Sequence, residues 1–106
     1  MPKFMFSANL NGEGAAGIIA EGGTSRRTEV ERAIGALGGT VEAFYFTFGK
    51  QDSILIADLP DTEAATAFAL GVASTGRVGV STTVLITPEE VDTAVSRKVE
   101  FRGPGQ

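Results

Sequence analysis

The chain has 106 residues, of which 42% are hydrophobic and 21% are charged, and its formal net charge is -4. This size suits one domain with one sizeable core, and the composition excludes the low-apolar, highly charged signature of disorder. The Lys and Arg residues are scattered apart from two pairs, so we expect no basic face for nucleic acid. Histidine and cysteine are absent, which removes the commonest general base near neutral pH and any disulfide or thiolate ligand.

The hydropathy pattern predicts neither a targeting segment nor a membrane span. No apolar run reaches the length of a signal-peptide core or of a transmembrane helix. We therefore expect a cytoplasmic protein with no membrane partner. One domain is expected over residues 1–98, and the polar tail of residues 99–106, which has nothing to bury, is expected to be flexible.

The chain begins with a strand and an interrupted helical segment. Residues 3–10 alternate loosely and are rich in Phe, which predicts a strand that ends at a turn signal. A helical pattern covers residues 13–37 with a break at Gly22-Gly23, after which Thr24 is expected to cap a new start. Glycine readily adopts the left-handed conformation after a helix, so Gly38-Gly39 should end this segment.

A hairpin and a second helical segment follow. Residues 41–48 and 53–59 have the β-branched and aromatic composition of strands. The polar link of residues 49–52 is so short that the two strands must be antiparallel. A helix is then expected from the cap at Pro60-Asp61 to about Thr75.

The last elements are a strand and a helix with a specific start signal. Residues 77–86 alternate between apolar and small polar side chains, as a fourth strand should. Thr87, Pro88 and Glu90 then supply an N-cap, a first-turn proline and the reciprocal capping carboxylate. This combination predicts a helix that ends near Lys98.

The order of these elements predicts an α+β, ferredoxin-like βαββαβ fold with a four-stranded antiparallel sheet and an additional C-terminal helix. The helices between the strands would cover one face of the sheet and leave the other bare. The strands nevertheless carry apolar groups on both sides, and we assign Met5, Tyr45, Leu55 and Leu85 to the bare face. Exposed apolar patches usually mark partners, so we expect a homodimer formed through this face, with higher oligomers left open.

Five short segments carry a resemblance to a known family. They are Glu21 to Arg27 (EGGTSRR), Leu37 to Gly39 (LGG), Glu42 to Gly49 (EAFYFTFG), Asp58 to Asp61 (DLPD) and Leu85 to Glu90 (LITPEE). In this order and spacing they resemble the GYD domain family over roughly residues 2–95. The resemblance implies membership of the dimeric α/β-barrel superfamily, in which two sheets cover each other, and implies little about chemistry.

The chain departs from the family signature at the hairpin. The Gly-Tyr-Asp signature falls where this chain reads Gly49-Lys50-Gln51-Asp52, so glutamine stands in place of the tyrosine. No role of that tyrosine therefore carries over to this chain. Gly49 and Asp52 are expected to keep a structural role in the turn.

One glycine motif suggests a nucleotide site but lacks the right surroundings. Gly12, Gly14 and Gly17 match GxGxxG between a strand and a helix, where a dinucleotide fingerprint belongs. The following strand leads into a hairpin, whereas a dinucleotide site needs parallel strands and a longer chain. We therefore favour a glycine-loosened helix start.

Four side chains are candidates for binding a ligand. Arg27 follows Gly22-Gly23, where backbone N–H groups and two guanidiniums would attract an anion, although a kinked helix with solvated arginines is the simpler explanation of the pattern. Tyr45 is the only tyrosine, and its hydroxyl would either orient a ligand or simply lie in an interface. Asn9 and Thr47 complete the set as further polar groups.

No metal or other cofactor is expected. The carboxylates mostly occupy turns and caps, and their spacing matches neither a calcium loop nor a carboxylate-bridged pair of metals.

Three hypotheses about function follow. The first is a homodimeric module that binds a small apolar or aromatic molecule between the sheet and the helices, or that acts as an accessory subunit. The second is an enzyme without cofactor, because similar members of the implied superfamily are monooxygenases, isomerases or cyclases; this chain would have to use Tyr45, Asn9, Thr and Arg. The third is a structural protein that assembles into higher oligomers.

Overall fold

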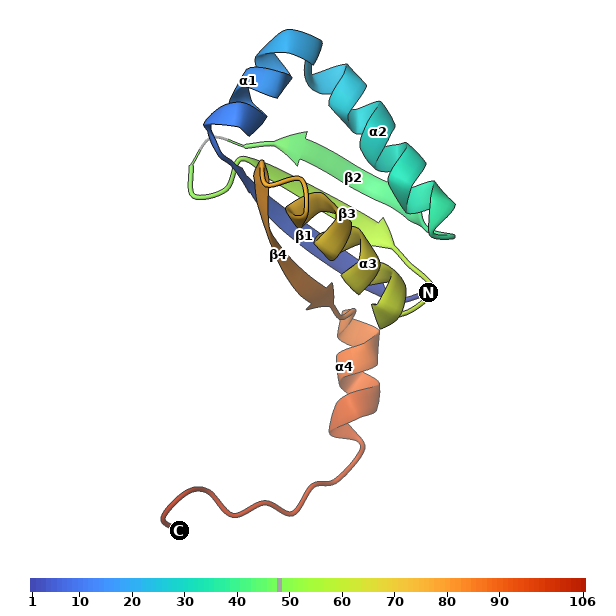
Figure 1. The fold of residues 1–106 in the computed structure, drawn as a ribbon. Coiled ribbons are helices and arrows are strands. Elements are labelled where there is room, and N and C mark those ends of the chain that lie inside the picture. Colours follow the sequence, from blue (N-terminus) through green and yellow to red (C-terminus); the bar gives the residue numbers. More distant parts are fainter. Residues whose placement is uncertain (48) are drawn as a thin grey trace.

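A computed structural model describes residues 1–47 and 49–106 of the chain, and it confirms the α+β, ferredoxin-like prediction (Figure 1). Four strands and four helices are present in the described part. In chain order they are β1 (Lys3–Leu10), α1 (Gly12–Glu21), α2 (Gly23–Ala36), β2 (Thr40–Phe46), β3 (Ser53–Asp58), α3 (Thr62–Ala73), β4 (Val78–Leu85) and α4 (Pro88–Val95).

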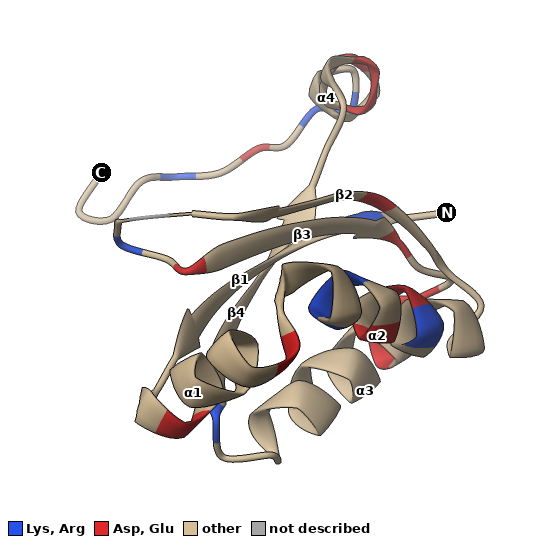
Figure 2. Ribbon diagram, turned by 90° about the horizontal axis from the view of Figure 1, so that it is seen from above, with Lys and Arg blue, Asp and Glu red and all other residues tan. Residues whose placement is uncertain are grey.

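The strands form one sheet in the order β2-β3-β1-β4, and every neighbouring pair is antiparallel. The two helical crossovers, α1-α2 and α3, each return the chain to the sheet on the same side. Figure 2 shows α1, α2 and α3 below the sheet and α4 above it. The sheet therefore has one face covered by helices, called here the helical face, and one face called the open face.

Residues just before α1 and α2 determine where these helices begin. The Asn11 side chain accepts a hydrogen bond from the Gly14 N–H at 2.9 Å and caps α1. The break between α1 and α2 is confirmed at Gly22, whose φ of 83° suits only glycine well. Thr24 is not the N-cap of α2, because the positive φ at Gly22 lets the second helix begin at once with Gly23.

The later caps agree with the sequence. Asp61 accepts from the Ala64 N–H at 2.8 Å at the start of α3. At α4 the capping box is complete, since the Glu90 N–H donates to the Thr87 hydroxyl and the Glu90 carboxylate accepts from the Thr87 N–H. The hairpin strands end at Phe46 and Asp58, and the predicted strand residue Phe48 lies outside the described residues.

The hydrophobic core lies entirely on the helical face. Its buried members are Phe4, Phe6, Ile34, Leu55, Ala57, Leu59, Ala65 and Phe68. Phe6 contacts the Phe68 ring edge-on, with a centroid distance of 4.9 Å, which links the central strand to α3. Ile34 and Phe68 are the buried side chains by which α2 and α3 pack on the sheet.

The side chains of β3 point to the opposite faces of the sheet from those that the sequence predicted. The register pairs Phe6 with Leu55 and Met5 with Ile56, so Leu55 points to the helical face, where it is buried. The assignment of Leu55 to the open face was therefore wrong, and Ile54 and Ile56 lie there instead. Side chains alternate along a strand, so a hairpin register one residue away from the expected one exchanges the two faces completely.

The C-terminal part stands apart from the sheet. None of the residues of α4 is buried, and α4 and the following chain extend away from the body of the fold (Figure 1). Residues 99–106 contain no helix or strand. No helix of the described chain combines the length and the apolar character that crossing a bilayer requires.

Candidate functional site

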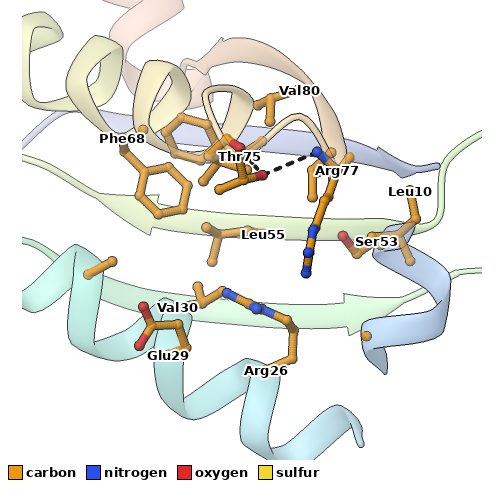
Figure 3. A pocket seen from close by; sticks show the side chains of 18 of the residues that line it. Leu10, Arg26, Glu29, Val30, Ser53, Leu55, Phe68, Thr75, Arg77 and Val80 are labelled. Atoms are coloured by element: carbon orange, nitrogen blue, oxygen red, sulfur yellow. Dashed lines mark hydrogen bonds between the residues drawn. The ribbon is translucent and has the colours of Figure 1, made fainter. Parts of the chain in front are cut away.

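The helical face contains a cleft of about 730 Å³ between α1-α2 on one side and α3 on the other. Figure 3 shows it with Val30 on one wall, Phe68 on the other and Leu55 on the floor. The core fills the space near the start of β1, whereas the cleft lies over its end, at Ala8 and Leu10. The sheet therefore provides a rigid floor, and two separate helical units provide the walls.

Most of the surface inside the cleft is apolar. Aromatic and aliphatic side chains of all four strands, α2 and α3 contribute to it. They include Phe6, Leu10, Val30, Leu37, Phe44, Phe46, Leu55, Phe68, Val72, Val78 and Val80. A cavity of this size with an apolar interior and few polar groups is the usual form of a small-molecule site.

Small residues on the walls keep the space open. Gly17 of α1 and Gly71 of α3 both line the cleft, and a Cβ added to either would meet nothing within 4 Å. Larger side chains at these two positions would therefore project into free volume. The backbone conformation does not require glycine at either position, because neither residue has a positive φ.

Charged residues are confined to the rim. Arg32 donates to both carboxylate oxygens of Glu29, at 2.8 and 2.6 Å. This hydrogen-bonded pair lowers the pKa of Glu29 and raises that of Arg32. The ion pairs of Arg26 and Arg77 are longer. The distance from a guanidinium nitrogen to a carboxylate oxygen is 3.4 Å between Arg26 and Glu21 and 3.5 Å between Arg77 and Glu13.

The start of α1 determines the position of Arg77. The Asn11 N–H donates to the Arg77 carbonyl at 3.0 Å, and its side-chain amide donates to the Gly76 carbonyl at 2.6 Å. A Cβ on Gly14 would lie 2.5 Å from the Arg77 carbonyl oxygen, so only glycine permits this approach. This close contact explains the second glycine of the GxGxxG pattern, whereas a Cβ on Gly12 or Gly17 would meet nothing within 4 Å.

The candidates from the sequence lie on different sides of the molecule. Tyr45 and Asn9 are exposed on the open face, on β2 and β1, and Tyr45 does not line the cleft. Arg27 lies on an exposed part of α2, and its neighbour Arg26 lines the cleft. The structure thus does not bring Tyr45, Asn9 and Arg27 into one cavity.

The hairpin candidates make local hydrogen bonds. The Thr47 hydroxyl donates to the carbonyl of Gln51, the residue that replaces the signature tyrosine. Asp52 ties the hairpin to the central strand, because its carboxylate accepts from the Leu10 N–H at 2.7 Å and its N–H donates to the Ala8 carbonyl at 2.8 Å. A Cβ on Gly49 would meet nothing within 4 Å.

The sequence reading did not identify the cleft residues. Arg26 was considered only as part of an anion motif, and Arg77 only as the start of a strand. The small-residue composition of α3 was the available signal, because helices lined with Ala and Gly leave space above a sheet. The distance between two helical walls depends on tertiary packing and is not encoded in either helix alone.

The open face has its own charged cluster at one end. Lys3 donates to Glu42 at 3.0 Å and to Asp58 at 3.0 and 3.2 Å. Its hydrogen bonds to Glu42 and then to Asp58 raise its pKa. In the described part of the chain, no three Asp, Glu, His or Cys side chains are grouped as a metal site would require.

Comparison with known proteins gives one finding. The family model described as GYD domain matches residues 4–95, most of the chain. No curated protein and no solved structure matches it.

Proposed function

Since the chain belongs to the GYD domain family, we propose that this member is a homodimeric module that binds a small apolar or aromatic molecule in the cleft between its helices. The observation that carries the proposal is the apolar cleft of about 730 Å³ on the helical face. Typical ligand pockets have about 300–1,000 Å³ and bury most of the ligand. The hypotheses of an enzyme and of a structural assembly have no comparable observation in their favour.

The chemistry of the cleft supports binding more than catalysis. Its floor and walls carry Phe, Leu and Val side chains, which gain free energy when an apolar ligand displaces water from them. Tyr45, the side chain named for a catalytic role, lies on the opposite face of the sheet. A reaction in the cleft would therefore have to use the rim residues.

A ligand assay with cleft-filling variants tests this function. The neutral probe 2-(1-naphthyl)ethanol is expected to bind with a dissociation constant on the order of 100 µM, measured by calorimetry. Gly17→Leu and Gly71→Leu place a side chain in the cleft and should weaken binding at least about tenfold. Equal affinity in these variants and the unaltered chain would refute the cleft as the site.

Gly35→Leu is the matched control. Gly35 lies in α2, has nothing within 4 Å of its added Cβ and does not line the cleft. The same change there should leave probe affinity unaltered. A loss of binding in all three variants would show a general effect of the substitution and would count against the proposal.

The dimer part of the proposal rests on the open face. Its apolar side chains include Tyr45, which is 70% exposed, and the half-buried Met5, Ile54 and Ile56. Four strands of up to eight residues give a footprint of roughly 19 by 26 Å, or about 490 Å², which is the lower limit of what a specific dimer buries on each partner. α4, on the same side of the sheet, adds the exposed Val91 and Val95.

Charge placed on the open face tests the dimer. Tyr45→Glu changes an exposed side chain, so the fold should survive while the mass from light scattering falls from dimer to monomer. Ile56→Glu is the second variant, nearer the centre of the sheet. Ile19→Glu, on an exposed position of α1, is the control and should leave the dimer intact. A monomeric unaltered chain at micromolar concentration would refute this part.

A further inference from the structure

Given the cleft as the binding site, we propose that its ligand is an amphipathic monocarboxylate whose carboxylate group is held at the rim by Arg26 and Arg77. The inference rests on the proposed function and adds the chemical class of the ligand. Its basis is the combination of an apolar interior with two arginines that have unused hydrogen-bonding capacity.

The two arginines approach the cleft from opposite walls. Arg26 comes from the first half of α2, and Arg77 comes from the turn that precedes β4. Figure 3 shows both side chains extending into the space between the walls, with Arg77 beside Leu55 and Arg26 below it in this view. A ligand whose apolar body lies on Leu55 and Phe68 would bring its polar end to this level.

Their present partners leave most of their donors available. A guanidinium has five N–H donors in a planar fork that matches a carboxylate. Within the described residues, Arg26 and Arg77 each make one long side-chain contact, at 3.4 and 3.5 Å, and both partner glutamates are largely exposed. Arg32, by contrast, is held by Glu29 in two short, paired bonds, so a ligand would have to displace a stronger partner there. An incoming carboxylate would therefore compete with weak, solvent-screened contacts at Arg26 and Arg77 only.

Hydrogen bonds fix the backbone of the turn that carries Arg77. Its carbonyl accepts from the Asn11 N–H at 3.0 Å, and its own N–H donates to the Thr75 hydroxyl at 3.3 Å. The close approach of Gly14 fixes the same turn from the other side. The turn therefore holds the backbone of Arg77 beside the cleft, and the side chain that extends from it is 57% exposed and accessible to a ligand.

A set of three matched probes tests the inference. They are 1-naphthaleneacetate, 2-(1-naphthyl)ethanol and 2-(1-naphthyl)ethylamine, which share the apolar body and differ in the polar group. Calorimetry should give the carboxylate about tenfold higher affinity than the alcohol, and the amine no advantage over it. Equal affinities, or a preference for the amine, would overturn the inference.

Variants then assign the preference to the two arginines. Arg26→Gln and Arg77→Gln should each weaken carboxylate binding about threefold, so that together they account for the tenfold preference, and should leave alcohol binding unchanged. Arg97→Gln, beyond the end of α4, is the control and should change neither. A loss with Arg27→Gln but not with Arg26→Gln would place the anion outside the cleft and overturn the inference.

Failure of the inference and failure of the proposed function give different results. If the alcohol binds and Gly17→Leu removes that binding, the cleft stands whether or not the carboxylate is preferred. If none of the three probes binds at millimolar concentration, the proposed function fails and the carboxylate inference fails with it.

Discussion

The two faces of the same four strands differ in how they meet their surroundings. The helical face contains the whole buried core and, at one end, the cleft. Among the described residues of the open face none is buried, although Met5, Tyr45, Ile54 and Ile56 are apolar like many core residues. Burial in this chain therefore depends on whether a helix covers the face and not on the hydrophobicity of the strand alone.

The comparison also separates two kinds of apolar surface. On the helical face, two of the chain's own helical walls enclose a space of small-molecule size. On the open face the surface is flat, broad and accompanied by the apolar side of α4, which suits a second protein surface. The proposed ligand site depends on the first surface, and the proposed dimer depends on the second.

The largest expected effect comes from removing a core ring of the helical face. Phe4→Ala should lower the free energy of unfolding by about 3–5 kcal/mol, because Phe4 is fully buried and leaves a cavity. Ser7→Ala, on the open face of the same strand, should change it by less than about 0.5 kcal/mol. Urea denaturation measures both. Similar losses would mean that the open face is packed as tightly as the core.

A smaller effect is expected where α1 meets the turn at Arg77. Gly14→Ala forces a methyl group against the Arg77 carbonyl and should lower the free energy of unfolding by about 1–3 kcal/mol. The displaced turn should also reduce the preference for 1-naphthaleneacetate over the alcohol. Gly17→Ala, in the same helix with open space around it, should stabilise the chain by about 0.5–1 kcal/mol. A neutral Gly14→Ala would show that the turn is not fixed by this contact.

Much of the fold could be predicted from local signals. The caps at Asp61 and Thr87 and the helix break at Gly22 each depend on neighbours within a few residues, and each prediction was confirmed. Thr24 was wrongly named as a cap because Gly22, with its positive φ, takes the N-cap position and starts α2 two residues earlier. Leu55 was placed on the wrong face because the register of a hairpin depends on its partner strand.

The candidate site was less predictable. The anion motif pointed to the right helix, yet the choice between Arg26 and Arg27 depends on how α2 is rotated against the sheet. Arg77 is distant in sequence from α2, and only the crossover topology places both at one rim. Sequence patterns of a single element cannot provide that juxtaposition.

The smallest expected effect tests the charged end of the open face. The hydrogen bonds from Lys3 to Glu42 and Asp58 raise the pKa of this lysine above its usual 10.5. A lysine whose pKa is higher in the folded than in the unfolded state adds to the free energy of unfolding. This contribution is complete when the pH is below the pKa of the unfolded state, and it disappears as the pH rises through the pKa of the folded state. The melting temperature of Lys3→Met should therefore lie slightly below that of the unaltered chain from pH 7 to 10, and the difference should shrink above about pH 10.5. A difference that stays constant to pH 12 would show that Lys3 acts through packing and not through its charge.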